Sequence, residues 1–125
     1  MTEKLQHILI LEDEPSSRAL LKAMLKSIGY NSVSETEDAE TALEVLKEKK
    51  VNLILSDWLL PGMSGLEFFR AVRENEAYKE IPFLLVSGQS EKAQVIEAIK
   101  SGVDGYILKP FSVHDIRKRI DQIFQ

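Results

Sequence analysis

At 125 residues, with 44% hydrophobic and 29% charged side chains, the chain has the size and composition of one globular domain rather than of a disordered or fibrous protein. Its formal net charge of -4 argues against a broad attraction to nucleic acid or anionic lipid, and no cysteine is present to form a disulfide, a thiolate metal site or a catalytic nucleophile. No stretch approaches the roughly 20 apolar residues of a membrane-spanning helix, and residues 1–6 lack the apolar core of a signal peptide, so we expect a cytoplasmic protein without membrane insertion.

The first predicted strand, residues 7–11, ends at a run of three acids, residues 12–14. Pro15 then suits the first turn of a helix, and the acids ahead of it favour the positive end of the helix dipole. Gly29 ends this helix, whose apolar residues recur at helical spacing. They are Leu21, Met24, Leu25 and Ile28.

A weaker strand and a second helix follow. Residues 31–36 predict an edge strand that faces water, because Val33 is its one strongly apolar side chain. Residues 38–49 predict a helix with an apolar stripe on its inner face. The stripe comprises Ala39, Ala42, Leu43 and Leu46.

A continuous apolar run over residues 51–57 ends abruptly in the carboxylate of Asp57. Such a run is typical of a strand that helices bury on both faces. In open α/β sheets ligands bind outside the carboxyl ends of the strands, so we predict that the function depends on Asp57. Ser64 is a candidate N-cap for the helix that follows. Its inner residues are predicted to be Leu66, Phe69 and Val72.

The last third of the chain predicts two more strands and two more helices. A strand at 83–86 ends at Ser87, and Ser90 is expected to cap a helix that stops at Gly102. The residues of this helix expected to point inward are Val95, Ile96 and Ile99. A strand at 106–108 ends at Lys109. The final helix opens on a predicted capping box, Ser112 to Asp115, and carries Val113, Ile116, Ile120 and Ile123.

Five strand-then-helix units in unbroken alternation predict an α/β fold, a parallel sheet with helices on both faces. The carboxyl ends of parallel strands share one edge of the sheet, so polar residues from distant parts of the chain should meet there. They are Glu12, Asp13, Asp57, Ser87 and Lys109. An all-oxygen set of carboxylates favours a hard cation such as Mg²⁺. With an ammonium and a hydroxyl beside it, this set suits phosphoryl transfer to a carboxylate.

These residues, in this order after the strands, resemble the receiver domain of bacterial response regulators, and the closest resemblance is to CheY-type chemotaxis regulators. The resemblance covers residues 1–125 as one domain and implies a flavodoxin-like, doubly wound five-stranded sheet of order 2-1-3-4-5, for which CheY is a standard example. It implies that Asp57 accepts a phosphoryl group from a histidine kinase. It also implies a Mg²⁺ site formed by Glu12, Asp13, Asp57 and the backbone carbonyl of Leu59.

The resemblance also assigns residues that respond to the phosphate. It implies that Lys109 pairs with the phosphoryl group, that Ser87 binds it through its hydroxyl, and that Tyr106 is an aromatic switch whose rotamer follows that hydroxyl. The peptide bond between Lys109 and Pro110 is expected to be cis. Two positions depart from the family pattern: residue 12 is Glu where Asp is commoner, and Leu59 is apolar where chemotaxis members often carry a polar residue.

Further matches to chemotaxis regulators fall on the face expected to bind a protein partner. They are Lys92, Val95, Tyr106, Phe111 and Arg119. By resemblance the partner is a flagellar-motor switch protein and the chain acts as a monomer that assists its own phosphorylation and dephosphorylation. A stand-alone receiver or phosphocarrier in another pathway has a similar sequence.

Two other classes of function fit less well. A haloacid-dehalogenase-type phosphatase also uses an aspartyl nucleophile with Mg²⁺, but it carries a second acid two residues on, where this chain has Leu59. A flavodoxin-like cofactor binder needs a phosphate loop rich in Ser, Thr and Gly after the first strand. The acids at residues 12–14 would repel a phosphate unless a metal intervened.

Overall fold

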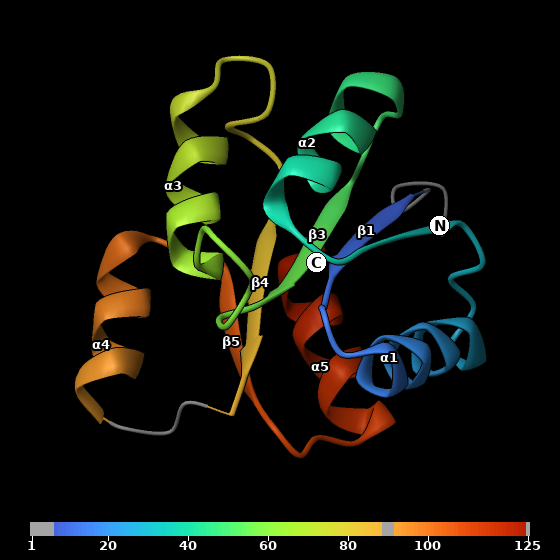
Figure 1. The fold of residues 1–125 in the computed structure, drawn as a ribbon. Helices are drawn as coiled ribbons and strands as arrows, with labels where there is room; N and C mark the ends of the chain where they lie inside the picture. The colour runs from blue at the N-terminus through green and yellow to red at the C-terminus, as the bar shows by residue number, and fades with distance from the viewer. Residues whose placement is uncertain (1–6, 89–91, 125) are drawn as a thin grey trace.

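A parallel sheet forms the centre of the molecule in the computed structural model, which describes residues 7–88 and 92–124 (Figure 1). The strands are Ile8–Leu11 (β1), Val33–Thr36 (β2), Leu53–Asp57 (β3), Phe83–Ser87 (β4) and Gly105–Leu108 (β5). The helices are Pro15–Ser27 (α1), Ala39–Glu48 (α2), Gly65–Glu74 (α3), Lys92–Ser101 (α4) and Val113–Ile123 (α5). The strand order β2-β1-β3-β4-β5 confirms the predicted flavodoxin-like, doubly wound α/β fold.

Helices cover both faces of the sheet and bury two apolar cores (Figure 1). Successive side chains of a strand point to opposite faces, so Leu9 packs toward α2 and α3 while Ile10 packs toward α1 and α5. The first four residues of β3 are all buried, as are all of β1 and β4. This burial on both faces explains why these strands are continuous apolar runs in the sequence. The edge strand β2 is buried only at Thr36.

Two predicted helix caps are confirmed, and one of them fixes the segment after Asp57. At the start of α3 the Ser64 hydroxyl accepts from the Glu67 backbone N–H at 3.1 Å, and the Glu67 carboxylate accepts from the Ser64 N–H at 2.8 Å. Ser112 and Asp115 form the same reciprocal capping box at the start of α5. The caps pair backbone groups that the first helical turn leaves without partners.

The prediction of the inner face of α4 was wrong for two residues. Ile96 and Ile99 are 39% and 62% exposed, whereas Ala98 is buried and Val95 packs partly against the core. Successive helical residues are rotated by roughly 100°, so a helix that contacts the sheet along the side of Val95 and Ala98 turns Ile96 and Ile99 outward. The predicted Ser90 cap lies outside the described residues.

Other predictions differ from the structure only at element ends. Strand β3 begins at Leu53, two residues after the predicted start at Val51.

The peptide bond between Lys109 and Pro110 is cis, as expected. None of the helices within residues 7–88 and 92–124 combines the length and apolar character needed to cross a lipid bilayer.

Candidate phosphoryl-acceptor and metal site

The ends of four strands place the predicted site residues at one edge of the sheet. Asp57 is the last residue of β3 and Ser87 is the last residue of β4, while Glu12 and Lys109 directly follow β1 and β5. The parallel register aligns these ends, since Leu11 pairs with Ser56, Asp57 with Val86, and Ser87 with Leu108. Residues far apart in the sequence therefore meet at this edge.

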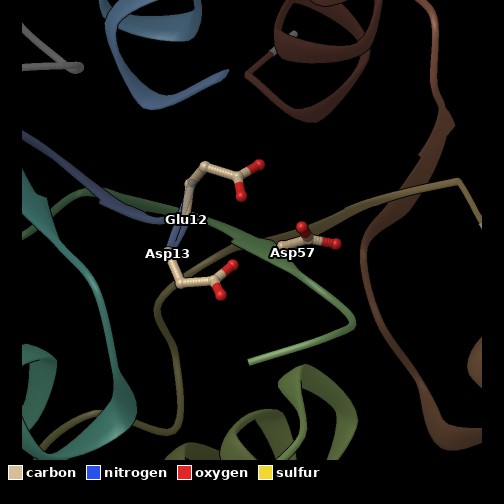
Figure 2. Close-up of side chains that lie close together, drawn as sticks. All are labelled: Glu12, Asp13 and Asp57. Carbon is tan, nitrogen blue, oxygen red and sulfur yellow. The ribbon is translucent and has the colours of Figure 1, made fainter. Parts of the chain in front are cut away.

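Three carboxylates converge at this edge (Figure 2). One oxygen each from Glu12, Asp13 and Asp57 lies within 4.8 Å of the others. Glu12 is buried at 4% exposure, whereas Asp13 is exposed. Carboxylates this close repel one another unless a cation or proton intervenes, and an all-oxygen set fits a hard divalent ion such as Mg²⁺. The donor set is therefore compatible with the predicted magnesium site.

The Lys109 ammonium bridges two of these carboxylates. Its Nζ donates to Glu12 Oε1 at 2.6 Å and to Asp57 Oδ2 at 3.0 Å. Burial alone would lower the pKa of Lys109, but the bonds to Glu12 and Asp57 outweigh burial and raise it, so Lys109 is charged. Burial raises the pKa of Glu12, and the bond from Lys109 opposes that shift. The site thus holds a positive charge against the Asp57 carboxylate.

The backbone after β3 also contacts Asp57. The Leu59 N–H lies 3.4 Å from Asp57 Oδ1, at the long end of hydrogen-bond geometry, and the Leu59 side chain is 61% exposed. The Leu59 backbone N–H thus lies beside Asp57, and the ligating role of the Leu59 carbonyl stays a prediction. Its apolar side chain lines the same acidic cleft as Asp13 and Lys109.

Ser87 and Tyr106 lie on the neighbouring strands β4 and β5, and their side chains are hydrogen-bonded. Ser87 is buried, and its backbone carbonyl accepts from the Lys109 N–H at 2.9 Å. Tyr106 is 9% exposed, and its ring meets Trp58 edge-on with centroids 6.2 Å apart. Burial raises the pKa of Tyr106, although its hydrogen bond with the Ser87 side chain acts in the opposite direction. Tyr106 is therefore linked to the site through its hydrogen bond with Ser87 and through its ring contact with Trp58, which follows Asp57 in the sequence.

The residues predicted to form a partner face do not all lie together. Tyr106 and Arg119 line one shallow groove along β5 and α5, and Val95 packs with Tyr106 in the core beneath α4. Phe111 instead packs against the opposite core, under α1 and α5. Lys92 opens α4, but its side chain lies outside the described part of the chain.

Two residues that support the site were not predicted from the sequence. The Arg18 guanidinium donates to the backbone carbonyl of Glu12 at 2.7 Å and also pairs with Glu35. Gly65, the first residue of α3, leaves no room for a side chain, because a Cβ there would collide with the backbone carbonyl of Asp57. A glycine directly after a helix cap is the one sequence signal that could have revealed this close approach.

Comparison with known proteins agrees with this geometry. The sequence profile of the response regulator receiver domain matches residues 8–121. The chain is 36% identical over 118 residues to chemotaxis protein CheY-3 of Vibrio cholerae, covering 94% of this chain and 91% of that protein. The structure is similar to that of the chemotaxis response regulator CheY4 of Vibrio cholerae, with a TM-score of 0.85, 28% identity, and coverage of 95% of this chain and 98% of that one.

A second similar structure is that of the receiver domain of sensor histidine kinase PA1611 from Pseudomonas aeruginosa PAO1. The TM-score is 0.84 at 25% identity, over 94% of this chain and 96% of that one. That structure is described with a magnesium ion coordinated in its active-site cleft.

Proposed function

The chain belongs to the response regulator receiver domain family. From this membership we propose that residues 1–125 act as one receiver domain and that Asp57 accepts a phosphoryl group from a histidine kinase. One observation carries the proposal: Lys109 bonds to both Glu12 and Asp57 inside a cluster of three carboxylates. Phosphoryl transfer to a carboxylate needs a nucleophile, a neutralising cation and a fixed ammonium. Asp57, the acid cluster and Lys109 supply these parts.

Mg²⁺ is the proposed cofactor, held by Glu12, Asp13, Asp57 and the backbone carbonyl of Leu59. When bound, the ion neutralises charge on the phosphoryl oxygens. The protein's own residues orient the reaction. Lys109 holds the Asp57 carboxylate in place, and Ser87 offers its hydroxyl at the end of the neighbouring strand. The chain thereby assists its own phosphorylation and dephosphorylation without being a multiple-turnover enzyme.

The proposed output is a change in binding to a protein partner. Tyr106 follows the Ser87 hydroxyl and alters the groove that it shares with Arg119. Likeness to chemotaxis proteins supports a flagellar-motor switch protein as the partner, with the chain acting as a monomer. A receiver or phosphocarrier in another pathway is the alternative, and the groove is compatible with it as well.

The proposal is tested by incubating the protein with acetyl phosphate and measuring its intact mass. We expect one added phosphoryl group in the presence of Mg²⁺ and none when the metal is chelated. Pull-downs with and without beryllofluoride, which mimics the phosphoryl group, would then identify the partner. Labelling that is unaffected by chelation would contradict the proposed role of the acid cluster.

Replacing Lys109 by Arg is predicted to separate phosphorylation from its output. Arg keeps the charge, but its planar guanidinium fills more space than a compact ammonium. We therefore expect labelling by acetyl phosphate to persist, whereas affinity for the flagellar-motor switch protein becomes the same with and without beryllofluoride. Lys26→Arg, at an exposed position on α1, is the matched control. A full response to beryllofluoride in Lys109→Arg would reject the coupling role.

The phosphorylated state is predicted to be long-lived because Leu59 is apolar. A water that attacks the aspartyl phosphate must approach past the residue two positions beyond Asp57, and leucine offers it no hydrogen bond. Gaining one positioning interaction of about 1.4 kcal/mol corresponds to a tenfold faster reaction. We therefore expect Leu59→Asn to lose its phosphoryl group about tenfold faster at saturating Mg²⁺. Ile99→Asn, at another exposed apolar position, serves as the control, and an unchanged rate in Leu59→Asn would refute the idea.

A further inference from the structure

A cavity of about 340 Å³ lies between α1 and the loop that follows β5, beside the acid cluster. We call it the α1 pocket. Leu20 and Leu21 of α1 form one wall, and Pro110 and Phe111 form another. Val86 is among the strand residues that line its base. Known small-molecule sites are concave, mostly apolar and about 300 to 1,000 Å³ in volume, so the α1 pocket falls within their range.

One end of the α1 pocket is polar. Glu12, Asp57 and Lys109 line both this pocket and the acidic cleft described above, so the two spaces adjoin. Two donor positions of Lys109 are already used, in its bonds to Glu12 and Asp57. Ionised carboxylates accept hydrogen bonds and cannot donate them. The side chains at this end can therefore mainly accept further hydrogen bonds. Glu12, Asp57 and Lys109 together carry a net negative charge.

The mouth of the α1 pocket carries an exposed apolar side chain. Leu20 is 55% exposed, whereas its neighbour Leu21 is buried in the core. Arg18 and Lys22, about one helical turn apart on α1, instead use their charges in ion pairs with Glu35. Leu20 therefore adds apolar surface at the entrance without adding a buried contact to the core.

We propose that the α1 pocket binds a compact, uncharged and largely apolar molecule that carries one hydrogen-bond donor, as an indole or a phenol does. An apolar cavity of about 150 Å³ accepts benzene, so a cavity about twice that size suits one or two fused rings. The rings lie against Leu20, Leu21 and Phe111, and the donor meets the carboxylate of Glu12 or Asp57. Without a bound cation the net charge at this end is negative, so the metal-free protein disfavours an anion there. The inference does not depend on the proposed phosphoryl transfer.

Indole and 1-methylindole form a matched pair of probes for the donor. They share the same ring system, but the methyl group removes the N–H. Titrations followed in ¹H–¹⁵N correlation spectra should show saturable shifts with indole at the amides of Leu21, Val86 and Phe111. Since a hydrogen bond to a charged group is worth about 1.5 to 3 kcal/mol, we expect 1-methylindole to bind about tenfold or more weakly. Equal affinity for the two probes would overturn the assignment of the donor.

Two variants at exposed apolar positions test the location of the site. Leu20→Gln makes the mouth polar and should weaken indole binding by roughly threefold or more, while Ile99→Gln, on α4, should leave it unchanged. Both side chains are more than half exposed, so neither change is expected to unfold the protein. Shifts that do not saturate, or an equal effect of the two variants, would reject the α1 pocket as a ligand site.

Discussion

Asp57→Asn is expected to abolish phosphoryl labelling completely. Among the described residues, no other carboxylate both ends a central strand and lies in contact with Lys109 and the acid cluster. Asparagine keeps the size and shape of aspartate but lacks the anionic oxygen that attacks phosphorus. The loss is a change of chemistry rather than of fold. Glu12 also bonds to Lys109, but it is buried, and a longer carboxylate there does not reproduce the position of Asp57.

The measurement is the intact mass after incubation with acetyl phosphate and Mg²⁺. Asp121→Asn is the matched control, since Asp121 is an exposed acid on α5, and it should be labelled like the parent. Circular dichroism should confirm that both variants fold. Labelling of Asp57→Asn at the parental level would disprove the assignment of the acceptor.

Gly65→Ala is expected to destabilise the protein strongly and to disturb the acceptor site at the same time. The added methyl group would meet the backbone carbonyl of Asp57, and backbone cannot move aside as a flexible side chain can. Gly65 is also tied to this segment by its N–H, which donates to the carbonyl of Trp58 at 2.8 Å. Overpacking of this kind usually costs 1 to 3 kcal/mol, and we expect about 3 kcal/mol because neither partner can relax.

Urea denaturation should show this loss as a lower midpoint with an unchanged slope. Labelling with acetyl phosphate should also slow, because the strained carbonyl belongs to Asp57, the proposed acceptor. Gly88→Ala is the stability control, since a Cβ at Gly88 meets no atom of the described residues within 4 Å. If Gly65→Ala were as stable as the parent, the close approach of α3 to Asp57 would not constrain the site.

The sequence was sufficient to predict the fold and the meeting of the site residues, for a specific physical reason. Strands β1 and β3 are buried on both faces, which requires continuous apolar runs, and each run is followed by an acid. Once all the strands are parallel, their carboxyl ends share one edge, and because β1 and β3 are neighbours in the sheet, Glu12 and Asp57 approach each other. The alternation of strands and helices therefore predicted the shared edge, and the resemblance to receiver domains supplied the strand order.

Contacts within an element were harder to predict. Helix α4 carries apolar residues on more than one side, so periodicity could not decide between Val95 with Ala98 and Ile96 with Ile99 as its inner face. Similarly, the resemblance to chemotaxis regulators at Tyr106 and Phe111 could not show that these two side chains pack in opposite cores. Their packing depends on the direction that the chain takes after β5. Such details require the packed structure.

The ammonium of Lys109 also acts as an internal counter-ion for the carboxylates of the acid cluster. The three carboxylates carry three negative charges, and without a nearby cation their repulsion would favour unfolding, which would make the folded state depend on a bound metal. Because Lys109 is part of the chain, its positive charge is present at any concentration of divalent ions. Folding should then depend less on free Mg²⁺ than it would without Lys109. Under the proposed function, free Mg²⁺ then affects phosphoryl transfer to Asp57 rather than folding.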